Sequence, residues 1–303
     1  MRARGHLLSC LVTMVIALAG FVTAGSLPAV ATPSTIQYVA LGDSYAAGTA
    51  AGSFPNCPHG PAGYPTLLDG AESRIVLPDQ DNVTCSGETT SEVAEHQLSA
   101  LDRDTRLVTL TVGAANLGLS AVAAACIGGT LRDCLAAIEP AQRELGDCPG
   151  GESTLGGRLT ALYAHVADKA RGARIVVTGY PLLFEPPANA DPVLAAKITA
   201  INEATAKLNC VIERAVATTQ ATYANIHYAD VTEEFAAHGI VIVTPPCTDP
   251  SAFIHSLLIC DPARPPRADS ESFHPTAAGY RAYADAISAA LPGGWLNKPP
   301  RSS

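Results

Sequence analysis

The stretch IQYVALGDSYAAG, residues 36–48, is apolar and β-branched as far as Leu41 and then changes abruptly to Gly42, Asp43 and Ser44. A short and nearly continuous apolar run is typical of a strand buried on both faces of a parallel sheet. Three later segments have the same character and also precede Gly, Pro or a polar turn: residues 106–113, 173–181 and 224–231. We therefore expect several parallel strands, with polar turns at their carboxyl ends.

Helical segments alternate with these expected strands, at residues 89–101, 154–172, 192–218 and 276–291. In the third of them, apolar residues recur at spacings of three and four, which is one face of a long helix. Alternation of strand and helix predicts an α/β fold in which helices cover both faces of a parallel sheet. The segments expected to be long loops are rich in Gly, Pro and Cys: residues 53–65, 126–153 and 241–270.

The first 31 residues have the features of a secretory signal peptide. Arg2 and Arg4 precede an apolar run, and Ala29-Val30-Ala31 forms an A-x-A cleavage site. A retained membrane anchor is the alternative, and the small residues with Pro28 favour processing over it. We expect cleavage after Ala31 and a single domain over residues 32–303, a length within the range of one α/β domain, in a secreted, extracellular protein.

The charge of the chain limits its partners. Residues 1–31 hold two Arg and no acidic residue, so the net charge of −9 over the whole chain becomes −11 without them. An acidic protein does not attract nucleic acid or an anionic membrane surface by charge. We therefore expect no nucleic-acid partner.

Eight cysteines follow the signal segment, and an even number in an exported chain indicates disulfides. Eight cysteines allow 105 pairings. We expect sequence neighbours to pair, and zinc ligation is disfavoured because neither C-x-x-C nor H-x(3–5)-H spacing occurs. No metal and no cofactor is therefore predicted, and the expected disulfides are Cys57–Cys85, Cys126–Cys134, Cys148–Cys210 and Cys247–Cys260.

Residues that follow strands deserve most weight, because ligands bind beyond the carboxyl ends of an open parallel sheet. Ser44 lies there, and a serine hydroxyl needs a base within hydrogen-bond reach before it can act as a nucleophile. The segment DSESFHPTAAGY near the other end of the chain offers His274 as that base and Glu271 as an acid to orient it. Taken singly, Gly-Asp-Ser is more often an ordinary turn. The G-x-S-x-G elbow of the α/β-hydrolases does not fit, because Ala46 replaces its second glycine.

Four ordered blocks together resemble the SGNH or GDSL hydrolases, and among them the secreted actinobacterial lipases, esterases and phospholipases. These blocks are YVALGDSYAAG, VTCSGETT, LTVGAANLG and ESFHPTAAGY. Cys85 before Ser86-Gly87 and the close pair Cys126 and Cys134 are also similar to that subfamily. The resemblance implies a flavodoxin-like three-layer α/β/α sandwich with a central parallel sheet.

The same resemblance implies that Ser44 attacks an ester carbonyl and that His274 takes its proton. The backbone N–H groups of Ser44 and Gly87 would then point at the developing oxyanion, where preorganised donors matter most. The family's D-x-x-H becomes Glu271-x-x-His274 here. Glu271 is the expected acid, and Asp269 or a backbone carbonyl is the alternative.

The third block departs from the family's G-x-N-D pattern. Ala115 replaces the asparagine whose side chain is the third oxyanion donor, and Asn116 replaces the aspartate. Loss of one such donor typically costs roughly 10² to 10³ in rate. We expect Asn116 to supply the donor if the loop is rebuilt.

These observations predict a serine ester hydrolase that cleaves carboxylic esters of lipids or small acyl esters through an acyl-enzyme at Ser44. A polysaccharide O-deacetylase of the same fold is one alternative. The other is a catalytically degenerate member that binds an acyl or glycan ligand, an alternative suggested by Ala115 in place of the oxyanion asparagine. Expected partners are a lipid or small-molecule ester and, transiently, a lipid-water interface, with the protein as a monomer.

Overall fold

The computed structural model describes residues 35–48, 56–69, 74–185, 191–241, 252–254, 272–293 and 295. The chain divides into two units, Met1–Pro33 and Ser34–Ser303, and every described residue belongs to the second. The expected signal peptide and its cleavage after Ala31 lie outside the described residues and stay predictions.

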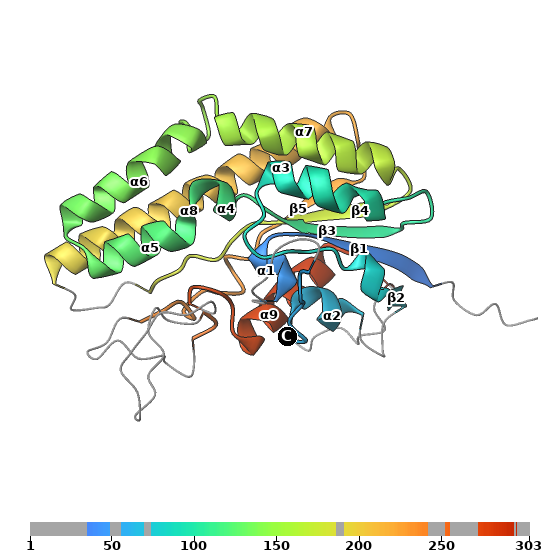
Figure 1. The fold of residues 1–303 in the computed structure, drawn as a ribbon, viewed down its shortest axis with the longest axis horizontal. Coiled ribbons are helices and arrows are strands. Elements are labelled where there is room, and N and C mark those ends of the chain that lie inside the picture. Colours follow the sequence, from blue (N-terminus) through green and yellow to red (C-terminus); the bar gives the residue numbers. More distant parts are fainter. Residues whose placement is uncertain are drawn as a thin grey trace, which may run out of the picture. The chain divides into compact units, whose positions relative to one another are not determined.

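A parallel sheet forms the centre of the second unit (Figure 1). Its strand order, β2-β1-β3-β4-β5, is that of flavodoxin-like folds. The four strands expected from the sequence are confirmed, whereas β2 is only two residues long, in an apolar run too short to indicate a strand. The strand bounds are β1 Ile36–Gly42, β2 Ile75–Val76, β3 Leu107–Thr111, β4 Arg174–Thr178 and β5 Ile226–Ala229.

Helices cover both faces of the sheet, which confirms the three-layer α/β/α architecture (Figure 1). Helices α2 (Tyr64–Leu68) and α9 (Ala277–Ala289) pack together on one face. Helices α3 (Thr90–Glu92), α7 (Thr154–Lys169) and α8 (Pro192–Gln220) lie on the other. Because each face is covered, the side chains of β3 are buried along its whole length. This explains the nearly continuous apolar character of the strand sequences.

The expected helix 89–101 is present but not uniform. After α3 it becomes π-helical over Val93–Gln97 (η2) and then 3₁₀-helical over Leu98–Ala100 (η3). Another 3₁₀ turn, η1, covers Asp79–Asp81. Residues 89–101 therefore have an irregular helical backbone where a regular helix was expected.

The expectation that residues 126–153 form a loop is wrong for most of that segment. Helix α5 (Leu119–Gly128) continues into it, and α6 (Leu131–Leu145) occupies its middle. The Thr130 side chain caps α6 through the N–H of Asp133, whose carboxylate bonds back to the N–H of Thr130, a capping box that starts a helix. This local signal outweighs the Gly and Cys content. Helices α5, α6 and the start of α8 pack together beyond the carboxyl ends of the strands.

Three of the four expected disulfides are confirmed: Cys57–Cys85, Cys126–Cys134 and Cys148–Cys210. The expected pair Cys247 and Cys260 lies outside the described residues. Disulfides are typical of proteins that function in an oxidising compartment. Within the described ranges, every helix is too short or too polar to cross a membrane.

Candidate active site

The chain turns sharply where β1 ends, and this turn presents Ser44. Gly42 has φ +130°, and a Cβ on it would lie 2.3 Å from the Thr111 carbonyl oxygen of the neighbouring strand, so only glycine fits. Asp43 follows as the N-cap of the short helix α1 (Ser44–Ala47), and its carboxylate accepts the N–H of Tyr45 at 3.0 Å. Ser44 therefore lies at the first position of a helix, half-exposed beyond the sheet.

The structure brings together Ser44 and His274, which lie 230 positions apart in the sequence. The Ser44 Oγ lies 2.7 Å from His274 Nε2, and His274 Nδ1 lies 3.1 Å from the carbonyl oxygen of Ser272. Because a carbonyl oxygen can only accept, Nδ1 carries the proton and Nε2 is left to accept the serine hydroxyl. This is the tautomer that a general base for Ser44 requires.

The segment that carries His274 is bound by the residue that follows Ser44. Phe273 has a φ of +67°, a strained backbone conformation for a residue with a side chain. The hydroxyl of Tyr45, the residue after Ser44, donates to the Phe273 carbonyl. The Tyr45 ring also lies 5.3 Å, between centroids, from the His274 ring. The side chain of the residue after Ser44 thus contacts the segment that carries His274, a link that the sequence pattern did not reveal.

The acid expected to orient His274 is Glu271, which lies outside the described residues, as does Asp269. Both assignments stay predictions. Among the described residues, the Ser272 carbonyl accepts the Nδ1 proton, which corresponds to the backbone-carbonyl alternative.

Gly87 occupies the third position of a tight turn, Cys85–Glu88, closed by the Glu88 N–H and the Cys85 carbonyl at 3.4 Å. Its φ of +85° is the value that a type II turn requires at that position. Gly87 is exposed, and a Cβ on it would have no heavy atom within 4 Å. The turn thus leaves open space around the expected oxyanion donor.

The third block forms the short helix α4 (Ala114–Leu117), in which Ala115 has no polar side chain. The Asn116 amide bonds to Thr90: Oδ1 accepts the Thr90 N–H at 3.0 Å, and Nδ2 donates to the Thr90 hydroxyl at 3.2 Å. These bonds argue against the expected oxyanion role of Asn116. They indicate instead that Asn116 holds the start of α3.

A buried link that the sequence reasoning missed joins the first and third blocks. The Tyr180 hydroxyl donates to Asp43 Oδ2 at 2.5 Å and accepts the N–H of Ala114 at 3.1 Å. Burial raises the pKa of Asp43 to about 7, although the hydrogen bond from Tyr180 opposes the shift. The Tyr-Pro pair that ends the third expected strand is the sequence signal for this contact.

A small apolar cavity of about 20 Å³ is lined by Tyr45 and Phe273, the sequence neighbours of Ser44 and His274. This lining places it at the carboxyl end of the sheet. Its lining residues are Tyr45, Ala114, Leu119, Ser120, Tyr180, Pro181, Leu183, Thr205 and Phe273.

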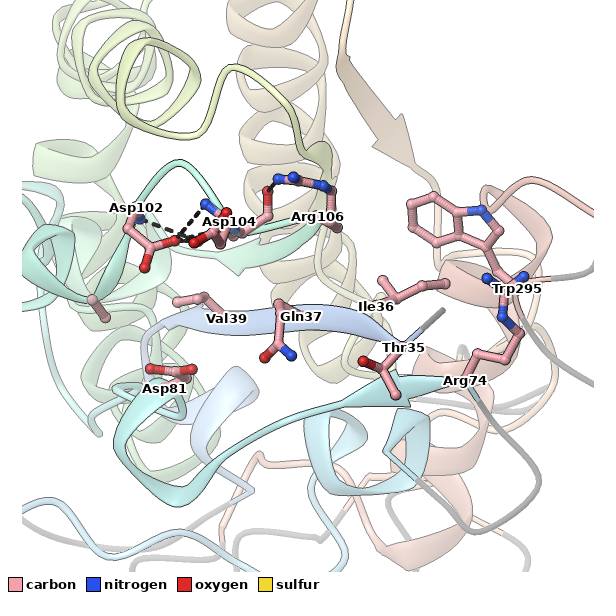
Figure 2. Close-up of a pocket in the computed structure, with 12 residues that line it drawn as sticks. Thr35, Ile36, Gln37, Val39, Arg74, Asp81, Asp102, Asp104, Arg106 and Trp295 are labelled. Carbon is pink, nitrogen blue, oxygen red and sulfur yellow. Dashed lines mark hydrogen bonds between the residues drawn. The ribbon is translucent and has the colours of Figure 1, made fainter. Parts of the chain in front are cut away.

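A much larger cavity, about 770 Å³, opens at the amino ends of β1 and β3 (Figure 2). Arg74, Arg106, Asp81 and Asp102 lie around it, with Trp295 at one side. Of the residues that the structure describes, no serine or histidine lines this cavity, and Ser44 lies at the opposite end of β1. The chemistry of the site, and not cavity volume, therefore identifies the candidate active site.

The fold and the paired serine and histidine define a class, the serine hydrolases built on a parallel α/β sheet. The chain belongs to the GDSL-like lipase/acylhydrolase family, whose model matches residues 40–282, a span that contains both Ser44 and His274. The protein is accordingly a carboxylic ester hydrolase.

Relatives with known names agree with this assignment. Lipase 1 of Streptomyces coelicolor is 30% identical over 281 residues, which cover 91% of this chain and 94% of that protein. Among solved structures, phospholipase A1 from Streptomyces albidoflavus NA297 is 31% identical with a TM-score of 0.69, covering 85% of this chain and 100% of that one. The extracellular lipase from Streptomyces rimosus is 27% identical with a TM-score of 0.65 at the same coverage.

Proposed function

We propose that the protein is a secreted serine ester hydrolase that cleaves carboxylic esters of lipids or small acyl esters through an acyl-enzyme at Ser44. The observation that carries this proposal is the 2.7 Å hydrogen bond between Ser44 Oγ and His274 Nε2. The names of the relatives, lipases and a phospholipase A1, support lipid esters as the substrate class.

Acylation begins when Ser44 Oγ bonds to the ester carbonyl carbon and its proton passes to His274 Nε2. The Nδ1–H of the imidazolium that forms stays hydrogen-bonded to the Ser272 carbonyl. Glu271 is our proposed acid for orienting His274, and Asp269 is the alternative. The proton on Nε2 then goes to the leaving alcohol as the C–O bond breaks. In deacylation, His274 Nε2 takes a proton from a water molecule whose oxygen bonds to the acyl carbon. Nε2 then returns that proton to Ser44 Oγ as the bond between the acyl carbon and Oγ breaks and the acid leaves.

The backbone N–H groups of Ser44 and Gly87 are the proposed oxyanion donors. With alanine at position 115 and the Asn116 amide bonded to Thr90, we assign the hole no side-chain donor. Exchanging Ala115 for Asn tests this assignment, because a third donor should raise kcat by ten-fold or more. An unchanged kcat would mean that another group already fills that place.

The hydrogen bond between Ser44 and His274 also argues against a degenerate, ligand-binding role, because it needs both catalytic groups in register. Activity on acetylated polysaccharide but not on longer esters would favour the deacetylase instead.

We further propose export, with cleavage after Ala31, action as a monomer and transient contact with a lipid-water interface. The three disulfides and the extracellular relative from Streptomyces rimosus support export. N-terminal sequencing of the protein from culture medium tests the cleavage position.

The experiment that tests the activity uses the purified mature protein and p-nitrophenyl esters of increasing chain length, followed by labelling with a fluorophosphonate. We expect hydrolysis and one labelled site at Ser44, located by peptide mass spectrometry. Failure at every chain length together with no label at Ser44 would overturn the proposal. The chain-length profile separates an esterase from a lipase.

A further inference from the structure

Two buried polar side chains, Glu88 and Gln97, lie behind the turn that presents Ser44 and have no part in the mechanism above. The Gln97 amide binds both polar groups of Gly42. The Gly42 N–H donates to Gln97 Oε1 at 2.7 Å, and Gln97 Nε2 donates to the Gly42 carbonyl at 2.9 Å. Because the N–H and C=O of one strand residue point to the same side, the amide replaces a neighbouring strand at the end of β1.

Glu88 is bound at both of its carboxylate oxygens. Gln97 Nε2 donates to Oε2 at 2.7 Å, and His96 Nδ1 lies 2.7 Å from Oε1 as an ion pair. The bond to Glu88 raises the pKa of His96, which favours the charged pair. A buried carboxylate without such partners is strongly disfavoured, so these contacts fix where Glu88 lies.

Neighbouring residues, His96 and Gln97, reach the same carboxylate from the segment Val93–Gln97, which is π-helical. Short π-helical turns inside helices are uncommon and frequently occur at functional sites. Thr89 and Asn116 hold the start of this helical segment, through the capping box and the bonds to Thr90. The position of Gln97 therefore does not depend on its own contacts alone.

These contacts close a ring that includes the turn carrying Gly87. The Gly42 carbonyl accepts the Cys85 N–H at 3.0 Å as well as the Gln97 amide. Cys85 begins the turn and Glu88 ends it, and Glu88 returns to Gln97. The disulfide to Cys57 also ties Cys85 in place. Gly42, two residues before Ser44, and Gly87, which itself carries a proposed donor, are thus fixed relative to each other.

We propose that Glu88 and Gln97, with His96 supporting Glu88, are positioning residues for the oxyanion hole. They hold the backbone N–H groups of Ser44 and Gly87 at the separation that the developing oxyanion needs. This matters more here than where a side-chain donor shares the charge, because alanine occupies position 115 and two backbone donors must act alone. The inference rests on the proposed function.

The test compares Glu88→Ala with Glu88→Gln, each measured as kcat per active site, with sites counted from the end point of fluorophosphonate labelling. Donors that act on the transition state affect kcat more than KM. We expect Glu88→Ala to lower kcat about ten-fold with KM changed less than two-fold. Glu88→Gln keeps the shape and an acceptor for Gln97, so it should recover kcat to within about three-fold.

Gln97→Met is the second variant and should also lower kcat with little change in KM. Its control is Gln220→Met, at an exposed glutamine whose amide also donates to a backbone carbonyl, that of Ile226 at the amino end of β5, far along the strands from Ser44. We expect the control to lose thermal stability but to keep kcat.

Wild-type kcat per labelled site in Glu88→Ala would overturn the inference, whatever its melting temperature. An equal loss of kcat in Gln220→Met would also overturn it, because the effect would then be general loosening. If the wild-type protein itself neither hydrolyses esters nor takes the label, the proposed function fails instead.

Discussion

The two ends of the sheet differ in a way that the size of their cavities conceals. At the amino end, a cavity of about 770 Å³ is bordered by exposed charged side chains such as Arg106, which bonds to carbonyls of its own loop. At the carboxyl end, where Ser44 and His274 meet, the cavity is only about 20 Å³, and polar groups such as Asp43 are buried and bonded across the fold. Reactive groups need fixed positions more than they need volume.

The largest effect on activity is expected when the nucleophile at the carboxyl end of the sheet is removed. Ser44→Ala should lower kcat by about 10⁴-fold or more, because loss of a catalytic serine leaves only binding and the oxyanion hole. Stability should change little, since Ser44 is half-exposed. Ester hydrolysis and chemical denaturation check the two halves of the prediction. Retention of even a tenth of the activity would move the chemistry away from the carboxyl end.

A smaller effect is expected from the contact that joins Ser44's neighbour to the histidine segment. Tyr45→Phe removes the hydroxyl that donates to the Phe273 carbonyl, so it should lower kcat about ten-fold and destabilise the protein by about 1–2 kcal/mol. Tyr163→Phe is the matched control, because the buried Tyr163 hydroxyl has no hydrogen-bond partner among the described residues. The control should be neutral in both activity and unfolding. Equal effects in both variants would contradict the prediction.

The carboxyl end should also make stability depend on pH. Burial raises the pKa of Asp43 to about 7, so the folded state keeps a proton that the unfolded chain loses near pH 4. Stability from this group is therefore present at low pH and falls as pH rises from about 4 to about 7. With about 1.4 kcal/mol per pKa unit, the change is on the order of a few kcal/mol.

Asp43→Asn should remove this fall, and urea unfolding of both proteins between pH 4.5 and 7.5 measures it. The difference between the two curves isolates Asp43 from other carboxyl groups, such as Asp102 and Asp133, whose pKa values are lowered. Parallel curves would show that Asp43 keeps an ordinary pKa.

The smallest effect is expected at the amino end. Arg106→Ala removes bonds to the carbonyls of Arg103 and Thr105 on an exposed surface, so kcat/KM should stay within two-fold and stability within about 1 kcal/mol. Steady-state kinetics and thermal unfolding check both. A ten-fold loss of activity would mean that the two ends of the sheet are coupled.

Much of the fold could be predicted, because a buried parallel strand and an amphipathic helix each leave a short-range pattern of apolar residues. The strands at 36–42 and 226–229 and the long helix at 192–220 follow from that pattern. Helix α6 was missed because its apolar stripe lies among Cys, Gly and Pro, and its signal is the cap at Thr130. Strand β2 is too short to leave any pattern.

By itself the sequence determined the α/β class, three disulfide pairs, and Ser44, Gly87 and His274 as the residues to examine, because these depend on local order and motif. Only the tertiary structure decided that Nε2 of His274 meets Ser44 and that Asn116 turns to Thr90. It also decided that Gln97 binds Gly42. Such contacts depend on side-chain directions and on backbone paths that meet from distant positions, which no short-range pattern encodes.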